Sequence, residues 1–325
     1  MKLGISYNVF DGEELLEYSL LSVRQLAEHI SVVYQTTSNY GQENKGLLSV
    51  LEKLQDRGLI DKLFKYTPKN FSMNFLLEHR KGGRENIKIN NEKVKDLYKN
   101  GTLNEIEKRD IGLQIAKANK CDCFMTMDAD EIYDTNKLQF ALDTFEVGGY
   151  DSSFCKMQTF YKLPTLKIPN ESYYVPLFYK INKHSRINFI DKSIFPVFCD
   201  PTRRMIAGYC KVFTREEIEM YHYSYVRKDI ASKIYNSSAQ KDKKIQKIVI
   251  DHFNNWKSIE QGAKLLGGDS CELIEVENKS PDSNSIKRES SSKVVNKKKS
   301  SKSPDSKVVN KKKSSKSRGS RKKKK

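Results

Sequence analysis

Apolar residues in the first 66 positions alternate between the spacing of strands and the spacing of helices. Short apolar runs at 2–8, 30–34 and 63–66 predict three buried strands. Between them, the segments 16–27 and 47–54 repeat leucine, valine and alanine at helical intervals. This order of strand and helix favours an α/β fold, a mostly parallel sheet flanked by helices.

Two local signals predict where these helices begin and end. Asp11 with Glu14 three residues later resembles a capping box, in which the Asp side chain accepts free N–H groups of the first turn. Gly58 follows the second helical segment and is suited to end it as a C-terminal cap. We therefore expect the first helix to start at Asp11 and the second to stop before Gly58.

The pattern weakens after the third strand and then returns. The stretch 67–103 is polar and rich in Lys and Asn, so we expect an insertion or a mobile loop there. A helix is predicted over about 104–119, with Ile111, Ile115 and Ala118 on its inward face.

The second half of the chain is expected to be mixed rather than alternating. Aromatic, strand-like segments at 152–162 and 173–181 follow each other without a long helix between them. Helical spacing returns near 228–256, where apolar side chains, Ile248 among them, are expected to seal the core. We predict one domain over residues 1–265, with an α/β first half and a mixed α+β C-terminal half.

Most of the positive charge lies at the end of the chain. The 325 residues have a formal net charge of +18, but residues 279–325 hold 19 Lys and Arg against 3 Asp and Glu, which leaves the first 278 residues at +2. The segment 292–303 recurs word for word at 306–317, and this Lys- and Ser-rich repeat has too little apolar surface to offset the entropy of ordering. We predict a disordered basic tail over 266–325 with a 14-residue repeat.

Cysteine usage and hydropathy favour a soluble protein of a reducing compartment. Six cysteines are scattered along the chain, and the one close pair, Cys121 and Cys123, is too near for the usual zinc or redox spacing. The first residues lack the apolar core of a signal peptide, and no apolar run approaches the ~20 residues that cross a bilayer. The expectation is a cytoplasmic protein with unpaired thiols.

Two acidic residues stand directly after a short apolar strand expected at 121–127. In Asp128-Ala129-Asp130, carboxylates one residue apart at a strand end can turn toward the same point in the following loop. Hard oxygen donors of this kind suit Mg²⁺ or Mn²⁺, and a nucleotide diphosphate would complete the octahedron. Such triplets are common on surfaces, but this one follows a strand, where open α/β sheets bind ligands.

Five short segments carry a family resemblance that spans residues 2 to about 235. They are Ile5-Ser6-Tyr7-Asn8, Val32-Val33-Tyr34-Gln35, Lys108-Arg109-Asp110-Ile111-Gly112-Leu113, Met127-Asp128-Ala129-Asp130-Glu131 and Tyr221-His222-Tyr223-Ser224-Tyr225-Val226-Arg227. On these segments the chain resembles the GT-A class of nucleotide-sugar glycosyltransferases, most closely the family 2-like enzymes. The resemblance implies a Rossmann-like GT-A fold and transfer of a hexosyl or pentosyl group from a UDP- or GDP-sugar donor to a hydroxyl acceptor, expected to be a glycan.

The resemblance also implies roles for individual residues. In that family, loops after the first two strands hold the nucleoside, a basic residue before the acidic triplet lies near the diphosphate, and the carboxylates hold a divalent metal. Asp110 stands where family members often have Asn, so a contact at that position stays open. The donor-binding residues implied here are Ser6, Tyr7, Asn8, Gln35, Lys108, Arg109, Asp128, Ala129 and Asp130.

His222 is a candidate third ligand for a metal held by Asp128 and Asp130. A neutral imidazole suits Mn²⁺, and some GT-A enzymes use such a late His. The alternative is a histidine that simply packs among the tyrosines beside it in the sequence. We expect Mn²⁺ or Mg²⁺ at Asp128, Asp130 and His222.

An inverting transfer would need a carboxylate that takes the proton of the acceptor hydroxyl. The candidates are Asp191, Asp200, Glu216 and Glu217. Asp200 is favoured because Asp200-Pro201 makes a defined turn and two arginines follow it. An Asp that only caps a turn is the alternative, and a retaining transfer would need no such base.

Two functions of other kinds stay open at this stage. A sugar nucleotidyltransferase would need a Gly-rich, Arg-bearing loop after the first strand, where residues 8–14 are acidic with a single Gly. A polyanion- or nucleic-acid-binding protein would act through the basic tail, with salt-sensitive and non-specific phosphate contacts. The tail has no aromatic residue for base stacking. It can also serve an enzyme by contacting anionic surfaces or nucleic acid.

Overall fold

The computed structural model describes residues 1–69, 100–187, 195–237, 242–266 and 269–276. Several of the expectations above therefore lie outside the described residues. They concern most of the polar stretch 67–103, the basic repeat beyond residue 276, and Asp191.

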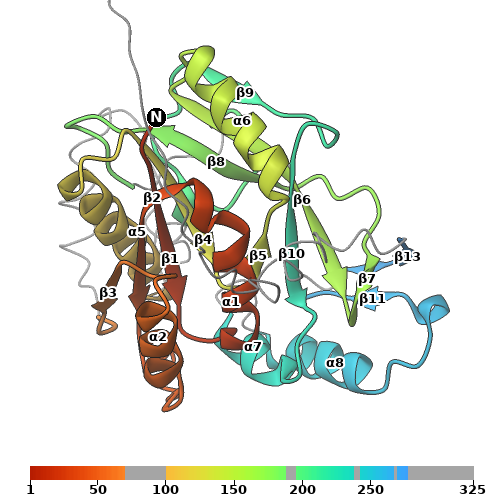
Figure 1. Ribbon diagram of the computed structural model, residues 1–325. Helices are drawn as coiled ribbons and strands as arrows, with labels where there is room; N and C mark the ends of the chain where they lie inside the picture. The colour runs from red at the N-terminus through yellow and green to blue at the C-terminus, as the bar shows by residue number, and fades with distance from the viewer. Residues whose placement is uncertain (70–99, 188–194, 238–241, 267–268, 277–325) are drawn as a thin grey trace, which may run out of the picture. The chain divides into compact units, whose positions relative to one another are not determined.

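The first 66 residues fold in the predicted order (Figure 1). The elements are β1 (Leu3–Val9), α1 (Glu13–Val23), β2 (Ala27–Tyr34), α2 (Leu47–Asp56) and β3 (Lys62–Lys65), with a 3-10 turn at Arg24–Leu26. β1 pairs with β2 in parallel, and β2 pairs with β3 in parallel. The predicted start of parallel strands linked by helices is confirmed.

The chain then crosses to the other side of β1. α5 (Asn100–Ala118) leads to β4 (Cys123–Asp128), which pairs with β1 in parallel. This part of the sheet therefore runs β3-β2-β1-β4, and the chain has left β1 in both directions. Ligands of open α/β sheets bind outside the carboxyl ends of the strands at such a reversal. Here that point lies between β1 and β4.

Beyond β4 the sheet becomes mixed, as predicted. β4 pairs antiparallel with β8, β8 with β6 and β6 with β7, whereas β10 runs parallel to β6. The elements of this part are β5 (Glu131–Ile132), α6 (Thr135–Val147), β6 (Ser152–Tyr161), β7 (Leu163–Lys167), β8 (Tyr174–Lys180), η2 (Pro201–Arg203), β9 (Cys210–Val212) and β10 (Glu219–Tyr225).

Helices return after β10. The elements are α7 (Ile230–Asn236), α8 (Lys243–Asn254), η3 (Ile259–Gln261), β11 (Ala263–Lys264), β12 (Ser270–Cys271) and β13 (Ile274–Glu275). Val249 and Phe253 of α8 pack with Ile230 and Ile234 of α7 in a small core, but Ile248 faces solvent, contrary to the prediction. β12 pairs with β11 and β13 with β7, so regular structure extends past residue 265.

Helices cover both faces of the sheet around β1. Ile5 and Tyr7 pack in one core with apolar residues of α1, α2 and α6. α5 covers the opposite face, where Leu113 and Ala116 pack with Phe124 of β4. Because side chains alternate between the two faces of a strand, the intervening residues of β1 lie under α5.

The contact between β1 and α5 is unusually close. A Cβ added to Gly4 would lie 2.7 Å from the Cβ of Ala116, and one added to Gly112 would lie 1.9 Å from Ser6 Oγ and 2.4 Å from Ser6 Cβ. Small residues on both elements therefore let α5 lie directly on the strand. This approach brings the turn of α5 that carries Lys108 and Arg109 to the end of the sheet.

Replacing Gly112 by Ala is expected to destabilise the fold. A methyl group gains about 1 kcal/mol of helix propensity, but overpacking costs typically about 1–3 kcal/mol, and the clash with Ser6 Cβ is not relieved by rotating a side chain. Urea unfolding measures the difference. Gly46→Ala is the matched control, since its Cβ would meet only Asn44 Oδ1, at 3.9 Å. Adding Ser6→Gly should recover part of the loss; undiminished stability of Gly112→Ala alone would contradict the close contact.

The predicted inward face of α5 was wrong in part. On α5, Ile111 and Ile115 are half-buried and Ala118 is exposed, because Arg109, Gly112, Leu113 and Ala116 face the sheet instead. Polar and small side chains thus occupy the inward stripe of this helix.

At α1 the predicted capping box is absent. The N-cap is Gly12, with φ 84° and no side-chain cap, and Asp11 Oδ1 instead lies 3.3 Å from Arg227 Nη1. At α2 the predicted end is confirmed: Gly58 has φ 74°, and its N–H donates to the carbonyl of Gln55.

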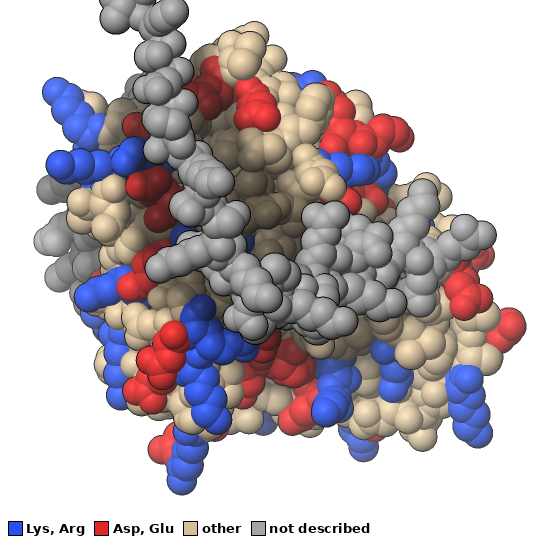
Figure 2. Space-filling model, in the orientation of Figure 1, with Lys and Arg blue, Asp and Glu red and all other residues tan. Residues whose placement is uncertain are grey.

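The surface and the cysteines agree with the compositional expectations. All six thiols are unpaired, as predicted. Acidic and basic side chains are interspersed over the face shown in Figure 2, in keeping with the near-neutral charge of the first 278 residues. Within the described ranges, no helix has both the length and the apolar character that a bilayer crossing requires.

Candidate functional site

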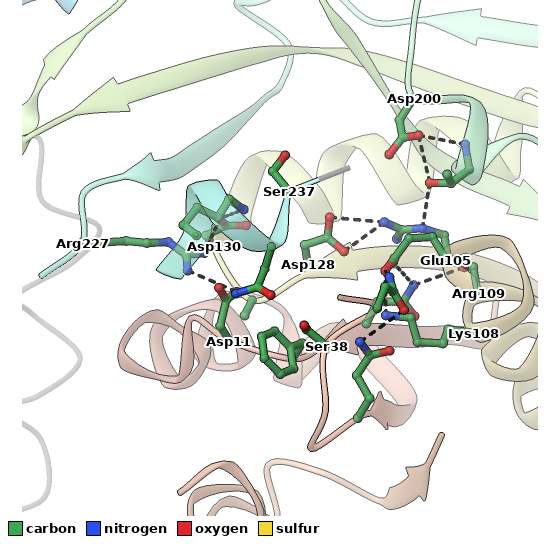
Figure 3. A pocket seen from close by; sticks show the side chains of 18 residues that line it. Asp11, Ser38, Glu105, Lys108, Arg109, Asp128, Asp130, Asp200, Arg227 and Ser237 are labelled. Atoms are coloured by element: carbon green, nitrogen blue, oxygen red, sulfur yellow. Dashed lines mark hydrogen bonds and ion pairs between the residues drawn. The ribbon is translucent and has the colours of Figure 1, made fainter. Parts of the chain in front are cut away.

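A cavity of about 180 Å³ lies at the carboxyl ends of β1, β2 and β4 (Figure 3). The strand register brings these ends together, since Asn8 of β1 lies opposite Asp128 of β4 and beside Val33 of β2. Other charged side chains of the wall come from α5, from the start of η2 and from α7. They include Lys108, Asp200 and Lys233, respectively. The cavity therefore occupies the reversal point of the sheet.

Asp128, the last residue of β4, is held by two arginines. Arg109 Nη2 donates to its two oxygens at 3.0 and 3.2 Å, and Arg203 Nη2 donates to Oδ2 at 2.5 Å. Arg109 is itself fixed by Thr126 Oγ1 at 2.8 Å. Burial alone would raise the pKa of Asp128, but the two guanidinium groups outweigh it and hold that pKa below its usual range.

Asp130 is almost fully buried and faces three nitrogen-bearing side chains. Arg227 Nη2 and Lys233 Nζ donate to Oδ2 at 2.6 and 3.0 Å, and His222 Nε2 lies 3.8 Å from Oδ1. Burial would raise the pKa of Asp130, but Lys233 and Arg227 hold it well below the usual value. Burial lowers the pKa of His222 to about 4, so its imidazole is neutral at pH 7.

Arg203 of η2 forms ion pairs with acidic residues at and just after the end of β4, and so holds η2 against that strand end. Besides Asp128, it pairs with both carboxylate oxygens of Glu131, with Nη1 at 2.9 Å from Oε2. Glu131 also accepts the backbone N–H of Asp128 at 3.1 Å. One buried arginine therefore pairs with the buried Glu131 and the half-buried Asp128, and fixes the position of η2.

The other end of the cavity is lined by amides around Glu105. Asn8 Nδ2 and Asn39 Nδ2 each donate to the Glu105 carboxylate at 3.3 Å, and Lys108 Nζ pairs with it at 2.8 Å. Asn8 Oδ1 and Gln35 Oε1 are buried without a hydrogen-bond partner among the described residues. Because unpaired buried acceptors are costly, these two oxygens suit a ligand that brings N–H or O–H donors.

Asp200 has one oxygen in a turn and one toward the cavity side of the loop. Its Oδ1 accepts from the backbone N–H and from Oγ1 of Thr202, both at 2.8 Å, whereas Oδ2 lies 3.8 Å from Arg203 Nε. A third of the side chain is exposed, and it lines the cavity. The turn-capping role and the cavity position are therefore both present.

The structure brings most of the predicted site residues together. Those that line the cavity are Asn8, Gln35, Lys108, Arg109, Asp128, Ala129, Asp130 and Asp200. His222 lies behind Asp130 rather than on the wall. Of the other described candidates for the base, Glu217 pairs with Lys211 at 2.9 Å and Glu216 is exposed, and neither lines the cavity.

Ser6 and Tyr7 do not line the cavity, so their predicted contact with a donor has no support in this geometry. Ser6 lies beneath Gly112 of α5, and Tyr7 Oη is 3.0 Å from Ser19 Oγ in the opposite core. Helices cover both faces of β1 before Asn8, which leaves only the strand end open.

Sequence reasoning missed several side chains of the cavity wall, among them Glu105, Asp11, Asn39 and Lys233. Glu105 lies one helical turn before Lys108 and pairs with it, a spacing that could have indicated it. Asp11 was assigned to a helix cap instead, and Asn39 and Lys233 stand in no recognisable motif. They reach the site only because the β1–α1 loop, the β2–α2 loop and α7 meet there.

The charges on the cavity wall are closely matched. Five acids face four bases: Asp11, Glu105, Asp128, Asp130 and Asp200 against Lys108, Arg109, Arg227 and Lys233. Each of these bases is already paired with one of the acids. A diphosphate would bring further negative charge, so its binding calls for an additional cation or for the release of a base.

The donor chemistry of the site fits a divalent cation. Two ionised carboxylates and a neutral imidazole are ligands that Mn²⁺ or Mg²⁺ accepts. Among the described residues no three His, Cys, Asp or Glu side chains are gathered as a ready metal site. Asp128 and Asp130 are instead occupied by Arg and Lys, so a metal would have to compete with these bases.

Comparison with known proteins gives structural likenesses only. No family model matches the sequence, and no curated protein matches it. Similar solved structures include S. aureus TarS, at 13% identity and a TM-score of 0.38 over 80% of this chain and 45% of that chain. Another is TarS 1–349 in complex with UDP-GlcNAc, at 14% identity and a TM-score of 0.39 over 78% of this chain and 73% of that one. This chain thus spans less than half of the longer TarS chain.

Proposed function

We propose that the protein is a nucleotide-sugar glycosyltransferase of the GT-A type, similar to family 2. It would move a hexosyl or pentosyl group from a UDP- or GDP-sugar to a hydroxyl acceptor such as a glycan. One observation carries the proposal: the two carboxylates at the end of β4 lie at the reversal point of the parallel part of the sheet, in a cavity that Asn8 and Gln35 also line.

A divalent cation is part of this proposal. Asp128 and Asp130 would hold Mn²⁺ or Mg²⁺, with His222 as a further ligand. When bound, such a cation supplies positive charge next to the departing diphosphate. The argument for it is the charge of the wall, where every base is already paired and a diphosphate adds negative charge.

The remaining residues have defined tasks. Arg109 and Lys108 lie beside the carboxylates and stabilise the charge that develops on the leaving diphosphate. Asn8 Oδ1 and Gln35 Oε1 accept hydrogen bonds from the nucleoside. In an inverting reaction, Asp200 takes the proton of the acceptor hydroxyl.

The two rival functions are less well supported. A triphosphate-binding nucleotidyltransferase site is disfavoured because Asp11, in the loop after β1, lines the cavity with its negative charge. Polyanion binding through the tail rests on residues 279–325, which lie outside the described residues.

Calorimetric titration of UDP and of GDP, with and without Mn²⁺, tests the proposal. We expect one diphosphate to bind and its affinity to rise with Mn²⁺. The Asp128→Ala/Asp130→Ala double variant should bind neither Mn²⁺ nor nucleotide, while Glu216→Ala, an exposed acid off the cavity, should bind like the wild type. A folded wild-type protein that binds neither diphosphate would refute the transferase proposal.

A further inference from the structure

Lys233 differs from the other bases that hold the two carboxylates. The side chains of Arg109, Arg203 and Arg227 are 2%, 4% and 3% exposed, whereas that of Lys233 is 29% exposed. The three arginines are therefore parts of the protein interior. Lys233 reaches the site from its edge.

The arginines also have second anchors, which Lys233 lacks within the part of the chain that the structure describes. Arg109 donates to Thr126, Arg203 pairs with Glu131, and Arg227 Nη1 lies 3.3 Å from Asp11 Oδ1. Among the described residues, the ion pair of the Lys233 ammonium is with Asp130. Lys233 can therefore leave its carboxylate without breaking another charged contact.

The helix that carries Lys233 closes one side of the cavity. α7 begins at the Asp229 cap, and Asn236 and Ser237 at its end line the cavity with Lys233. Gln42 of the β2–α2 loop accepts from Asn236 Nδ2 at 2.5 Å, which links α7 to the opposite wall. Figure 3 shows Asp130 between Asp11 on one side and Ser237 on the other. Lys233 thus stands on the wall of the cavity that α7 forms and is partly exposed there.

We infer that Lys233 is the exchangeable cation of this site. In the nucleotide-free protein its ammonium neutralises Asp130. With a divalent cation and a nucleoside diphosphate present, Lys233 leaves Asp130 and its ammonium binds the diphosphate, where it stabilises the leaving group. The inference rests on the proposed function for its diphosphate and its metal.

Electrostatics explains why the exchange occurs. Asp130 presents Oδ2 to Lys233 and Oδ1 to His222, so a metal held by Asp130 and His222 would share one carboxylate with the ammonium. Two cations on one carboxylate repel each other. Arg227 is buried and anchored by Asp11, and therefore stays. The ammonium moves because a phosphate oxygen offers it a new anionic partner.

The exchange predicts that one variant binds Mn²⁺ more tightly and the nucleoside diphosphate more weakly than the wild type. In full-length Lys233→Met, the Kd for Mn²⁺ without nucleotide should fall about tenfold, because a competing charge is gone. With saturating Mn²⁺, the Kd for UDP or GDP, whichever the wild type binds, should rise about tenfold through loss of a charge-assisted contact. Electron paramagnetic resonance of free Mn²⁺ measures the first constant and calorimetry the second.

Two further variants separate the exchange from a structural role. Lys233→Arg keeps the charge and should retain wild-type-like Mn²⁺ affinity, and Lys228→Met removes an exposed lysine of the same segment and should change neither constant. Thermal unfolding of each variant shows whether it is folded. A Kd for Mn²⁺ that is unchanged or higher in Lys233→Met overturns the inference, as does the absence of Mn²⁺ binding in both proteins. A wild type that binds Mn²⁺ but no diphosphate instead refutes the proposed function.

Discussion

Replacing Arg203 by Met is expected to lower the free energy of unfolding by about 3–5 kcal/mol. The substitution keeps most of the side-chain volume but leaves Glu131, which is buried, without its guanidinium partner, whereas Asp128 keeps Arg109. An uncompensated buried carboxylate costs far more than the pair contributes when intact. Chemical denaturation of the variant and of the wild type, with circular dichroism as the probe, measures the loss.

Two other variants show whether the loss comes from charge. Adding Glu131→Gln to Arg203→Met removes the stranded charge and should restore part of the stability. Arg57→Met removes an arginine whose pair with Glu17 is exposed, and should leave the unfolding midpoint where it was. An Arg203→Met protein as stable as the wild type would mean that water reaches this cluster and that the burial described above is wrong.

Replacing Asp200 by Asn is expected to reduce the rate of sugar transfer by about 10²–10⁴-fold, the usual contribution of a general base. Asn keeps an acceptor for the N–H of Thr202, so the turn at η2 should persist. The affinity for the nucleoside diphosphate should therefore stay unchanged. Release of UDP or GDP from the nucleotide sugar, with water as the acceptor, gives the rate without knowledge of the natural acceptor.

Glu217→Gln is the control for this substitution. It neutralises a carboxylate that pairs with Lys211 away from the cavity, and its rate should equal that of the wild type. Full activity of Asp200→Asn would assign the residue to the turn alone and would favour a transfer that needs no base at this position.

The elements that were predicted well are those whose apolar residues follow one period. In β1, Leu3, Ile5 and Tyr7 enter the core at every second position, and in α2 Leu47 and Leu51 recur one turn apart. These patterns depend on local geometry alone, so the sequence contains them in full. The position of Asp128 and Asp130 followed for the same reason, because Asp128 ends a regular strand and Asp130 lies just after it.

α5 shows why the rest of the site was harder to predict. Its inward stripe carries Lys108, Arg109 and Gly112, which are buried by ion pairs and by a close backbone contact. A prediction based on apolar spacing places charged residues and glycine on the solvent-facing side of a helix. It therefore placed Ile111 and Ile115 in the core. When charged residues of a site occupy the buried face of a helix, the spacing of apolar residues no longer indicates which face is buried.

The partners of the two carboxylates were beyond local reasoning. Arg203 is 75 residues from Asp128 in the sequence, and Arg227 and Lys233 are 97 and 103 residues from Asp130. Their approach depends on β10 running parallel to β6 and on its pairing with β5. The spacing of apolar residues within one segment does not indicate which strands pair with each other.

The long separation of these ion pairs has a consequence for how the chain folds. Asp128, Asp130 and Glu131 end the parallel half of the sheet, but the bases from η2, the end of β10 and α7 come much later in the chain. Before those segments arrive, Arg109 can pair with Asp128, but Asp130 and Glu131 cannot be desolvated without leaving their charges unmatched. The acidic loop after β4 can therefore be buried only once the C-terminal half has folded against it. This dependence makes formation of the two halves cooperative.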